Sequence, residues 1–150
     1  MATARDIAGY ILQLAKAVDA EGGYDLITNM KLQKLVYYCQ GFFLAFYDKP
    51  LFDESIEAWE HGPVCPPLYQ EFKAYGATPI PINSDSYTDK LTDEEMKLIG
   101  LVFGEYGQYT AWRLREMTHQ ESPWIETPLG QIIPLDKMKI YFKTRVVDED

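Results

Sequence analysis

The sequence has few of the residues from which metal centres and disulfide frameworks are built. It contains two cysteines and two histidines in 150 residues. Two cysteines cannot define a disulfide framework, so we expect Cys39 and Cys65 to be free thiols, as in a reducing cytoplasm. A structural zinc site needs four ligands, whereas His61, Cys65 and His119 are three scattered ones. The sequence therefore predicts no metal site and no cofactor.

Long apolar runs are also lacking. No stretch approaches the roughly 18 consecutive apolar residues that a transmembrane helix needs. The amino-terminal residues Met-Ala-Thr-Ala-Arg include no apolar segment of the kind found in a signal peptide. We therefore expect a cytoplasmic protein with no membrane partner.

Positive charge is scarce, because 14 lysines and arginines stand against 23 aspartates and glutamates, for a net charge of −9. Binding to nucleic acid generally requires a basic face, so a nucleic-acid partner is not expected, although a local basic patch is compatible with this total. An acidic surface favours solubility and attraction to a basic protein. Aromatic residues make up 14% of the chain, including 11 tyrosines. Tyrosine is enriched in protein interfaces, and the alternative for these rings is burial in the core.

The most informative stretch is residues 29–46, which we interpret as one long central helix. Its apolar positions recur at steps of three and four, the spacing of a buried helical stripe. These positions are Leu32, Leu35, Val36, Cys39, Phe43 and Phe46. Tyr37, Phe42 and Leu44 widen the stripe until the helix is apolar on most sides, which is typical of a helix inside a bundle. Gly41, in its middle, indicates close approach of another backbone.

Local signals predict the other elements. Helices are expected from Thr3 to about Ala20, from Pro67 to Tyr75, after the Thr92–Glu95 capping box, from Thr110 to about Thr118, and from Asp136 onward with Ile140 and Tyr141 packed inward. Gly22-Gly23 is expected to end the first helix, Pro123 and Pro128 to mark a loop, and residues 146–150 to fray. Residues 55–59 and 78–86 are expected to pair as strands. The predicted fold class is mainly α: a compact single-domain helical bundle, residues 1–150, around helix 29–46, with a small two-stranded β element.

Catalytic motifs are absent from the sequence. It has no phosphate-binding glycine loop, no HExxH and no GxSxG. A small enzyme or metal-site protein using Cys65, His61 and His119 remains an alternative, provided that a base lies within hydrogen-bond reach of the thiol. In the simpler interpretation, His61 orients a Gly-Pro turn and His119 is a cation at a helix carboxyl terminus. The sequence does not define the oligomeric state.

Three motifs in a fixed order carry a resemblance to a known family. They are TNMKLQKLVYY at residues 28–38, IEAWEHGPV at residues 56–64 and THQESPW at residues 118–124. Pro50-Leu-Phe52, Tyr69, Phe72-Lys73, Tyr75-Gly76, Leu114 and Ile140-Tyr-Phe142 complete the pattern. Together they resemble the Panacea domain, also called the SocA-like antitoxin or phage-associated domain, over roughly residues 5–143. Cys65-Pro66-Pro67 is less typical of that family.

The resemblance implies a mainly helical antitoxin domain that performs no catalysis. Members of such a family bind and silence a partner toxin, usually encoded next door and often on a prophage or mobile element. One branch acts as an adaptor that delivers its toxin to a AAA+ protease, which is an alternative function for this chain. The expected partners are therefore a cognate toxin and, for the adaptor alternative, a AAA+ protease.

Six residues form the candidate partner-binding patch. Lys31 and Lys34 lie in the first turns of helix 29–46, where the positive end of the helix dipole disfavours cations by roughly 0.3–1 kcal/mol each. An acidic group, either of a partner or of Glu57 or Glu60, is expected to offset that cost. The proposed patch, formed or supported by polar-tipped aromatic residues beside these charges, comprises Lys31, Lys34, Tyr37, Trp59, His61 and Trp124. Packing in the core is the alternative role of each member.

Overall fold

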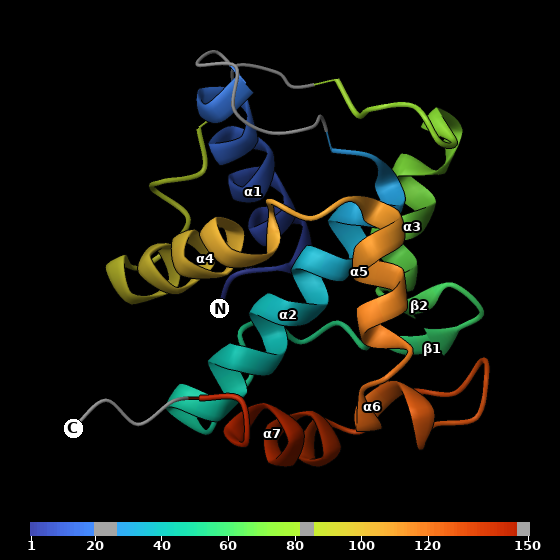
Figure 1. Cartoon of the computed structure of the whole chain (residues 1–150). Helices are drawn as coiled ribbons and strands as arrows, with labels where there is room; N and C mark the ends of the chain where they lie inside the picture. Colours follow the sequence, from blue (N-terminus) through green and yellow to red (C-terminus); the bar gives the residue numbers. More distant parts are fainter. Residues whose placement is uncertain (20–26, 82–85, 147–150) are drawn as a thin grey trace.

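The fold is organised around one buried helix. The computed structural model describes residues 1–19, 27–81 and 86–146. Helix α2 (Asn29–Tyr47) crosses the centre of the molecule and contacts α1, α3, α4, α5, α7 and β2 (Figure 1). The surrounding helices are α1 (Ala4–Asp19), α3 (Pro66–Phe72) with the 3-10 turn η1 (Lys73–Tyr75), α4 (Asp93–Tyr106), α5 (Ala111–Thr118), α6 (Ser122–Ile125) and α7 (Leu135–Lys143). The predicted mainly helical, compact architecture around a central helix is confirmed.

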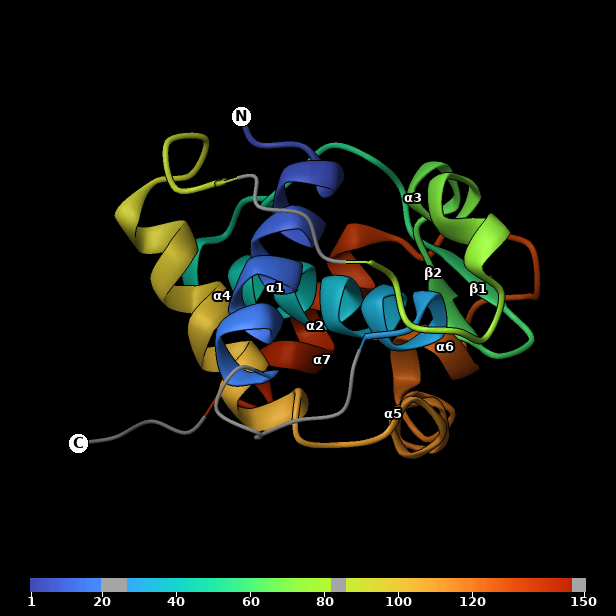
Figure 2. The ribbon, with the colours of Figure 1, turned by 90° about the horizontal axis from the view of Figure 1, so that it is seen from above.

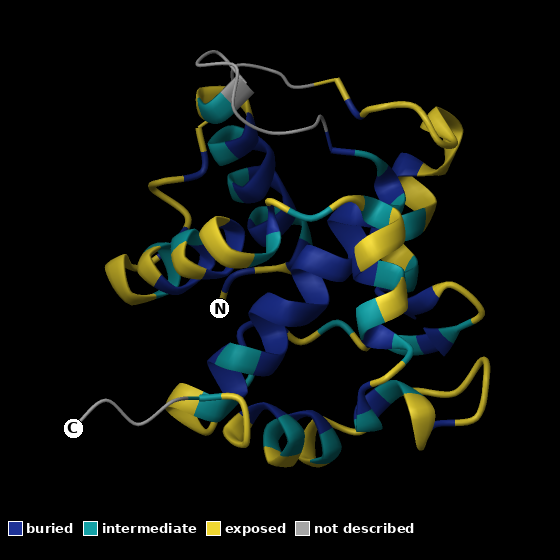
Figure 3. Cartoon of the chain, viewed as in Figure 1, coloured by how far each residue is buried: buried dark blue, intermediate teal, exposed yellow. Residues whose placement is uncertain are grey.

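Helix α2 is buried along most of its length, as its apolar periphery predicts (Figure 3). Thr28 is its N-cap, and the Thr28 hydroxyl accepts a hydrogen bond from the backbone N–H of Lys31. The predicted stripe is buried through Phe43, but Phe46 is 52% exposed, so its assignment to the core was wrong. The helix ends one residue later, where Asp48 adopts φ 57° and its N–H donates to the carbonyl of Leu44. The side chains of Phe46 and Tyr47 in the last turn are therefore exposed, while Asp48 pairs with Lys139 and Lys143 of α7 (Leu135–Lys143).

Gly41 marks a close contact, although not the one that the sequence suggested. A Cβ atom at this position would overlap the ring of Phe142 on α7, whereas we expected a neighbouring backbone. Phe142 is fully buried, and its ring packs edge-on against Tyr37 at 5.4 Å and Phe42 at 4.8 Å between ring centroids. The glycine therefore makes room for the ring by which α7 closes over α2.

The small β element is a hairpin rather than the pair of segments predicted. Strand β1 (Glu57–Trp59) pairs antiparallel with β2 (Gly62–Val64), with Ala58 opposite Pro63. Gly62 has φ 114°, a value that only glycine adopts easily, and it makes the tight return possible. The expected partner, residues 78–86, forms no strand in its described part, since Pro79 and Pro81 cannot donate ladder hydrogen bonds. Residues 82–85 lie outside the described chain.

Several helix signals are confirmed and a few were wrong. Thr92 and Glu95 form the predicted capping box, and Thr110 caps α5. The last helix begins one residue earlier than Asp136, with Pro134 as N-cap; Ile140 is 68% exposed, and the buried positions are Met138 and Phe142. The loop expected around residue 123 contains the short helix α6. The first-helix stop at residues 22–23 and the terminal residues 147–150 fall outside the described residues.

Each described helix is too short or too polar to cross a membrane.

The Gly41–Phe142 contact predicts an unusual response to a helix-favouring substitution. Gly41→Ala should lower the free energy of unfolding by about 1–3 kcal/mol, because the added methyl group overlaps the Phe142 ring. Gly100→Ala in α4 is the matched control, since nothing lies within 4 Å of a Cβ there. That control should raise stability by about 0.5–1 kcal/mol, the usual gain of alanine over glycine in a helix. Urea denaturation measures both, and equal stabilisation by the two variants would contradict the packing described.

Candidate partner-binding site

Three of the six candidate residues line one pocket. Lys34, Trp59 and His61 face a cavity of about 510 Å³ bounded by the first turns of α2, the hairpin, α3 and the start of α5. Other lining residues are Met30, Glu60, Tyr69, Lys73 and Ala111. The walls are aromatic on one side, since the rings of Trp59 and Tyr69 meet edge-to-face at 5.0 Å. Residues far apart in the sequence, from Met30 to Ala111, thus line a single cavity.

Lys34 lies in this cavity almost completely buried, with 1% of its surface exposed. No residue that the structure describes gives its ammonium group a hydrogen bond or an ion pair, and the acid at the cavity, Glu60, is not paired with it. Burial, with a further contribution from the charge of Arg115, lowers the pKa of Lys34 to about 7. The expected pairing of Lys34 with Glu57 or Glu60 is therefore not formed among the described residues.

The hairpin leaves space for this lysine. A Cβ atom at Gly62 would lie 2.5 Å from Cε of Lys34 and 2.8 Å from the hydroxyl of Thr118. The stem of Lys34 therefore passes directly beside the hairpin backbone. Because Gly62 also has a positive φ, both the turn and the passage of the lysine require glycine at this position.

Lys31 takes a different route from Lys34, despite its place one turn away on the same helix. Its ammonium group is buried and donates to the backbone carbonyl of Gly107 at 2.7 Å. Gly107 is the C-cap of α4, where the negative end of that helix dipole favours a cation. The unfavourable position at the start of α2 is thus offset by the end of α4, and Lys31 holds two helices together.

Trp124 does not line the pocket but contacts the pocket residue Trp59. Its indole N–H donates to the carbonyl of Trp59 at 2.7 Å, and its ring stacks on His119 with centroids 4.1 Å apart. Burial is the main cause, with the charge of Arg115, of a lowered pKa for His119. His119 is the C-cap of α5, so its expected position at a helix carboxyl terminus is confirmed, but desolvation of the ring disfavours the expected cation. Nε2 of His119 is buried without a hydrogen-bond partner among the described residues.

Tyr37 lies in the interior and does not line the pocket. Its hydroxyl donates to one oxygen of Glu121 at 3.0 Å, and the hydroxyl of Tyr38 donates to the other at 2.7 Å. Glu121 is 7% exposed, and burial raises its pKa to about 7 against the lowering effect of the two hydroxyl donors. This carboxyl group ties the chain between α5 and α6 to the middle of α2.

Two residues that extend from the pocket residue His61 along α5 were missed from the sequence. The guanidinium of Arg115 lies over the ring of Trp112 at 4.5 Å, and its Nε donates to Nδ1 of His61 at 2.9 Å. Trp112 is 57% exposed. The sequence contains one signal for this pair. Trp112 and Arg115 are three residues apart in a segment capped by Thr110, so they are expected to share a helix face. Their position beside His61 depends on tertiary contacts that no local pattern encodes.

The groups needed for nucleophilic or metal chemistry are poorly placed. The thiols of Cys39 and Cys65 are buried, and burial raises the pKa of Cys65 to about 11 and that of Cys39 further. A thiol with a raised pKa supplies little thiolate at neutral pH and is a weak nucleophile. Nδ1 of His61 is engaged by Arg115. Among the described residues, no cluster of three or more His, Cys, Asp and Glu side chains could hold a metal.

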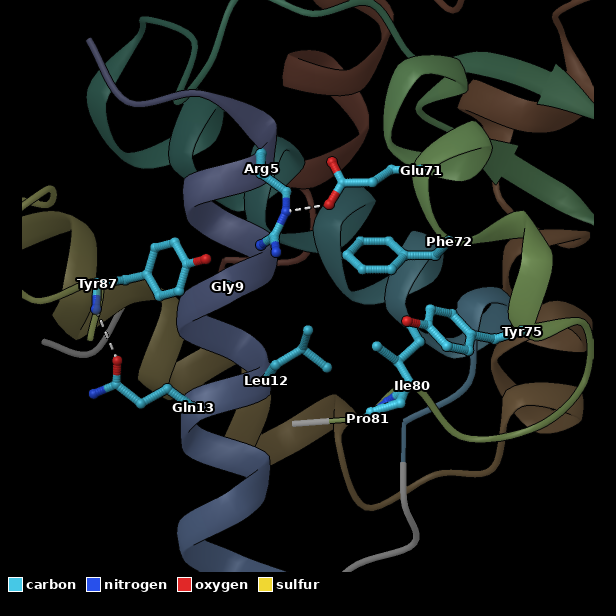
Figure 4. Close-up of a pocket in the computed structure, with 10 residues that line it drawn as sticks. All are labelled: Arg5, Gly9, Leu12, Gln13, Glu71, Phe72, Tyr75, Ile80, Pro81 and Tyr87. Atoms are coloured by element: carbon cyan, nitrogen blue, oxygen red, sulfur yellow. Dashed lines mark hydrogen bonds and ion pairs between the residues drawn. The ribbon is translucent and has the colours of Figure 1, made fainter. Parts of the chain in front are cut away.

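A second cavity, of about 270 Å³, lies between α1 and α3 (Figure 4). Arg5 crosses its mouth, where it pairs with Glu71 and lies over the Phe72 ring at 5.1 Å. The backbone N–H of Tyr87 donates to Gln13 at 3.0 Å. None of the six candidate residues lines this cavity, and its wall includes Pro81, next to the gap at residues 82–85. We therefore place the candidate site at the larger cavity.

The raised pKa of Glu121 predicts a distinct pH dependence of stability. Between pH 4.5 and about 7 the folded chain keeps a proton that the unfolded chain has released. This contribution is fully present below pH 4.5 and is lost as pH rises through about 7, by at most about 1.4 kcal/mol per pH unit. Glu121→Gln should remove that decline, whereas the exposed Glu116→Gln should retain it. The free energy of unfolding is measured by urea denaturation at several pH values between 4.5 and 7. An equal decline with pH in wild type and Glu121→Gln would contradict the assignment.

The similarity to known proteins covers the part of the chain that contains Lys34, Trp59 and His61. The family model described as "Antitoxin SocA-like, Panacea domain" matches residues 32–125, which include most of α2, the hairpin and α5. The antitoxin SocA of Caulobacter vibrioides (strain NA1000 / CB15N) is 41% identical over 73 residues, which cover 49% of this chain and 36% of that relative. The chain thus matches little more than a third of the length of this curated relative. No solved structure matches the chain. Since the family model covers more than half of the sequence, the chain belongs to the SocA-like antitoxin family, the Panacea domain.

Proposed function

We propose that this chain is an antitoxin that neutralises a partner toxin by binding it directly, on the face that surrounds the Lys34 pocket. The observation that carries this proposal is the exposed aromatic and cationic rim at that pocket, in a chain of an antitoxin family. The rim is the contact series Trp112–Arg115–His61, in which His61 itself lines the pocket together with Lys34 and Trp59. Trp, Tyr and Arg are the residues that most often dominate binding energy in protein interfaces.

The rim is held in place before any partner binds. Arg115 is fixed by the Trp112 ring on one side and by His61 on the other, so little conformational freedom is left to lose on binding. Helix α5, which carries Trp112 and Arg115, lies at the outer side of the molecule and is seen almost along its axis in Figure 2. A partner can therefore reach Trp112 without rearrangement of the bundle.

The buried candidates support this face from within. Lys31 joins α2 to the end of α4, Tyr37 joins α2 to Glu121, and Trp124 supports the backbone of Trp59. In this proposal the sequence motifs that contain these residues preserve the geometry of the binding face, while Lys34, Trp59 and His61 are the members that touch the partner.

Binding fits the site better than catalysis does. The Cys65 thiol is buried with a raised pKa, and Nδ1 of His61 is occupied by Arg115, so the proposed nucleophile and base are each in an unfavourable state. An aromatic rim over an apolar-walled cavity is instead the usual composition of an interface centre.

The test is co-expression of the chain with the product of the adjacent reading frame, read out as growth rescue and co-purification. Wild type should rescue growth and retain the toxin at an unchanged cellular level. Trp112→Ala and Arg115→Ala should each weaken binding by about 2 kcal/mol or more, which is roughly thirtyfold, because each removes a rim anchor. Leu101→Ala is the matched control, since Leu101 is 64% exposed on α4, away from the pocket.

Three results would contradict the proposal. If wild type does not bind the product of the adjacent reading frame, the proposed partner is wrong. If both rim variants bind it as wild type does, the proposed binding face is wrong. Loss of the toxin from cells, with rescue that depends on a AAA+ protease, would instead indicate an adaptor that delivers the toxin for degradation.

A further inference from the structure

Among the described residues, Lys34 is an almost buried amine whose charged form has no counter-charge. The side chain of Lys34 is 1% exposed and lines the 510 Å³ pocket, and the described chain offers its ammonium group neither a hydrogen bond nor an ion pair. Burial of an isolated ammonium group is costly, and proteins normally pair such a group or lack it. Removal of the amine from Lys34 should therefore favour folding, which indicates that the amine is retained for another purpose.

The groups around Lys34 do not compensate its charge. Arg115 and His61 lie at the rim, and Lys73 lines the same cavity. His119 lies near enough for the charges of Lys34 and His61 to lower its pKa. The acidic residue of the lining, Glu60, is exposed and forms no ion pair with Lys34. The centre of the cavity is therefore locally positive in a chain with a net charge of −9.

This arrangement is selective for one kind of anion. A polyanion such as nucleic acid would be repelled by the acidic remainder of the surface. The walls next to the Lys34 amine are the apolar and aromatic groups of Met30, Trp59 and Tyr69, which suit an anion with an apolar stem better than a phosphate dianion that is polar on all sides. A single carboxylate on an apolar stem would pair with the Lys34 ammonium group through a charge-assisted hydrogen bond, and its stem would pack against the apolar walls.

We propose that the Lys34 pocket is the receptor for one aspartate or glutamate side chain of the partner polypeptide, with Lys34 as its counter-ion and Trp59 and Tyr69 as the walls around its stem. This inference rests on the proposed function for the source of the carboxylate. The pocket itself can be tested without a partner.

The first test is a titration of the isotopically labelled chain with phenylacetate and with its neutral amide, phenylacetamide, at about pH 6. At this pH, which lies below its pKa of about 7, Lys34 is mostly protonated. Phenylacetate should shift the indole N–H signal of Trp59 in an NMR spectrum, and the amide should bind at least about tenfold more weakly. Equal binding of acid and amide would overturn the proposal, as would stronger binding of inorganic phosphate. This comparison uses the wild-type chain and requires no variant to fold.

The second test replaces the amine while keeping the side-chain volume. Lys34→Met should lose the response to phenylacetate and should be at least as stable to heat as wild type below pH 7. Lys97→Met, at an exposed position of α4, should retain the full response. A Lys34→Met chain that still responds to phenylacetate as wild type does, or a clear loss of its stability, would overturn a ligand-binding role for the amine.

The third test asks whether the partner supplies the carboxylate. Lys34→Met should bind the adjacent gene product at least about tenfold more weakly than wild type does, because loss of one member of a buried charge pair is costly. Unchanged partner affinity, in a variant that has lost the phenylacetate response, would overturn the partner assignment alone. If the wild-type chain binds no partner, the proposed function fails, and the phenylacetate titration still decides the nature of the pocket.

Discussion

The structure depends on the burial of α2 along most of its length, and this helix carries two buried lysines as well as its apolar residues. Lys31 and Lys34 are both almost inaccessible, but the fold treats them differently. Lys31 reaches the carbonyl of Gly107 at the end of α4, so the dipole of one helix neutralises a cation carried by another. Lys34 receives no such partner in the described chain and ends in the pocket. The same sequence motif therefore supplies one contact between helices and one residue of the proposed site.

The polar contacts made by α2 explain why the three family motifs occur together. Gln33 accepts from the backbone of Cys65 just after the hairpin, and Tyr37 and Tyr38 donate to Glu121 between α5 and α6. Buried polar groups of this kind are costly unless every partner is present, so a change in one motif is felt by the others. The hairpin and α5 are thereby fixed against one helix, and their adjoining edges enclose the pocket.

Much of the fold was predictable because its signals are local. The apolar spacing of residues 29–46, which is confirmed as far as Phe43, and the caps at Thr92 and Thr110, which are confirmed, depend on neighbouring residues only. The signals that failed depend on tertiary partners. Pairing of residues 57–59 with 62–64 follows from the geometry at Gly62, and exposure of Phe46 follows from where the bundle ends. For the site, the lysines and Trp59 could be chosen from the sequence, but the Trp112–Arg115–His61 rim joins segments more than 50 residues apart.

The central claim is that Lys34 is a buried amine kept without a counter-ion until a partner provides one, and its own titration tests this most directly. NMR of the free chain, labelled at the lysine side chains, should show Lys34 titrating near pH 7 rather than at its ordinary value of 10.5. Saturation with phenylacetate or with the adjacent gene product should raise that pKa by about one unit or more, because a bound carboxylate favours the charged form. A Lys34 pKa near 10.5 in the free chain, or one that no carboxylate alters, would contradict the account.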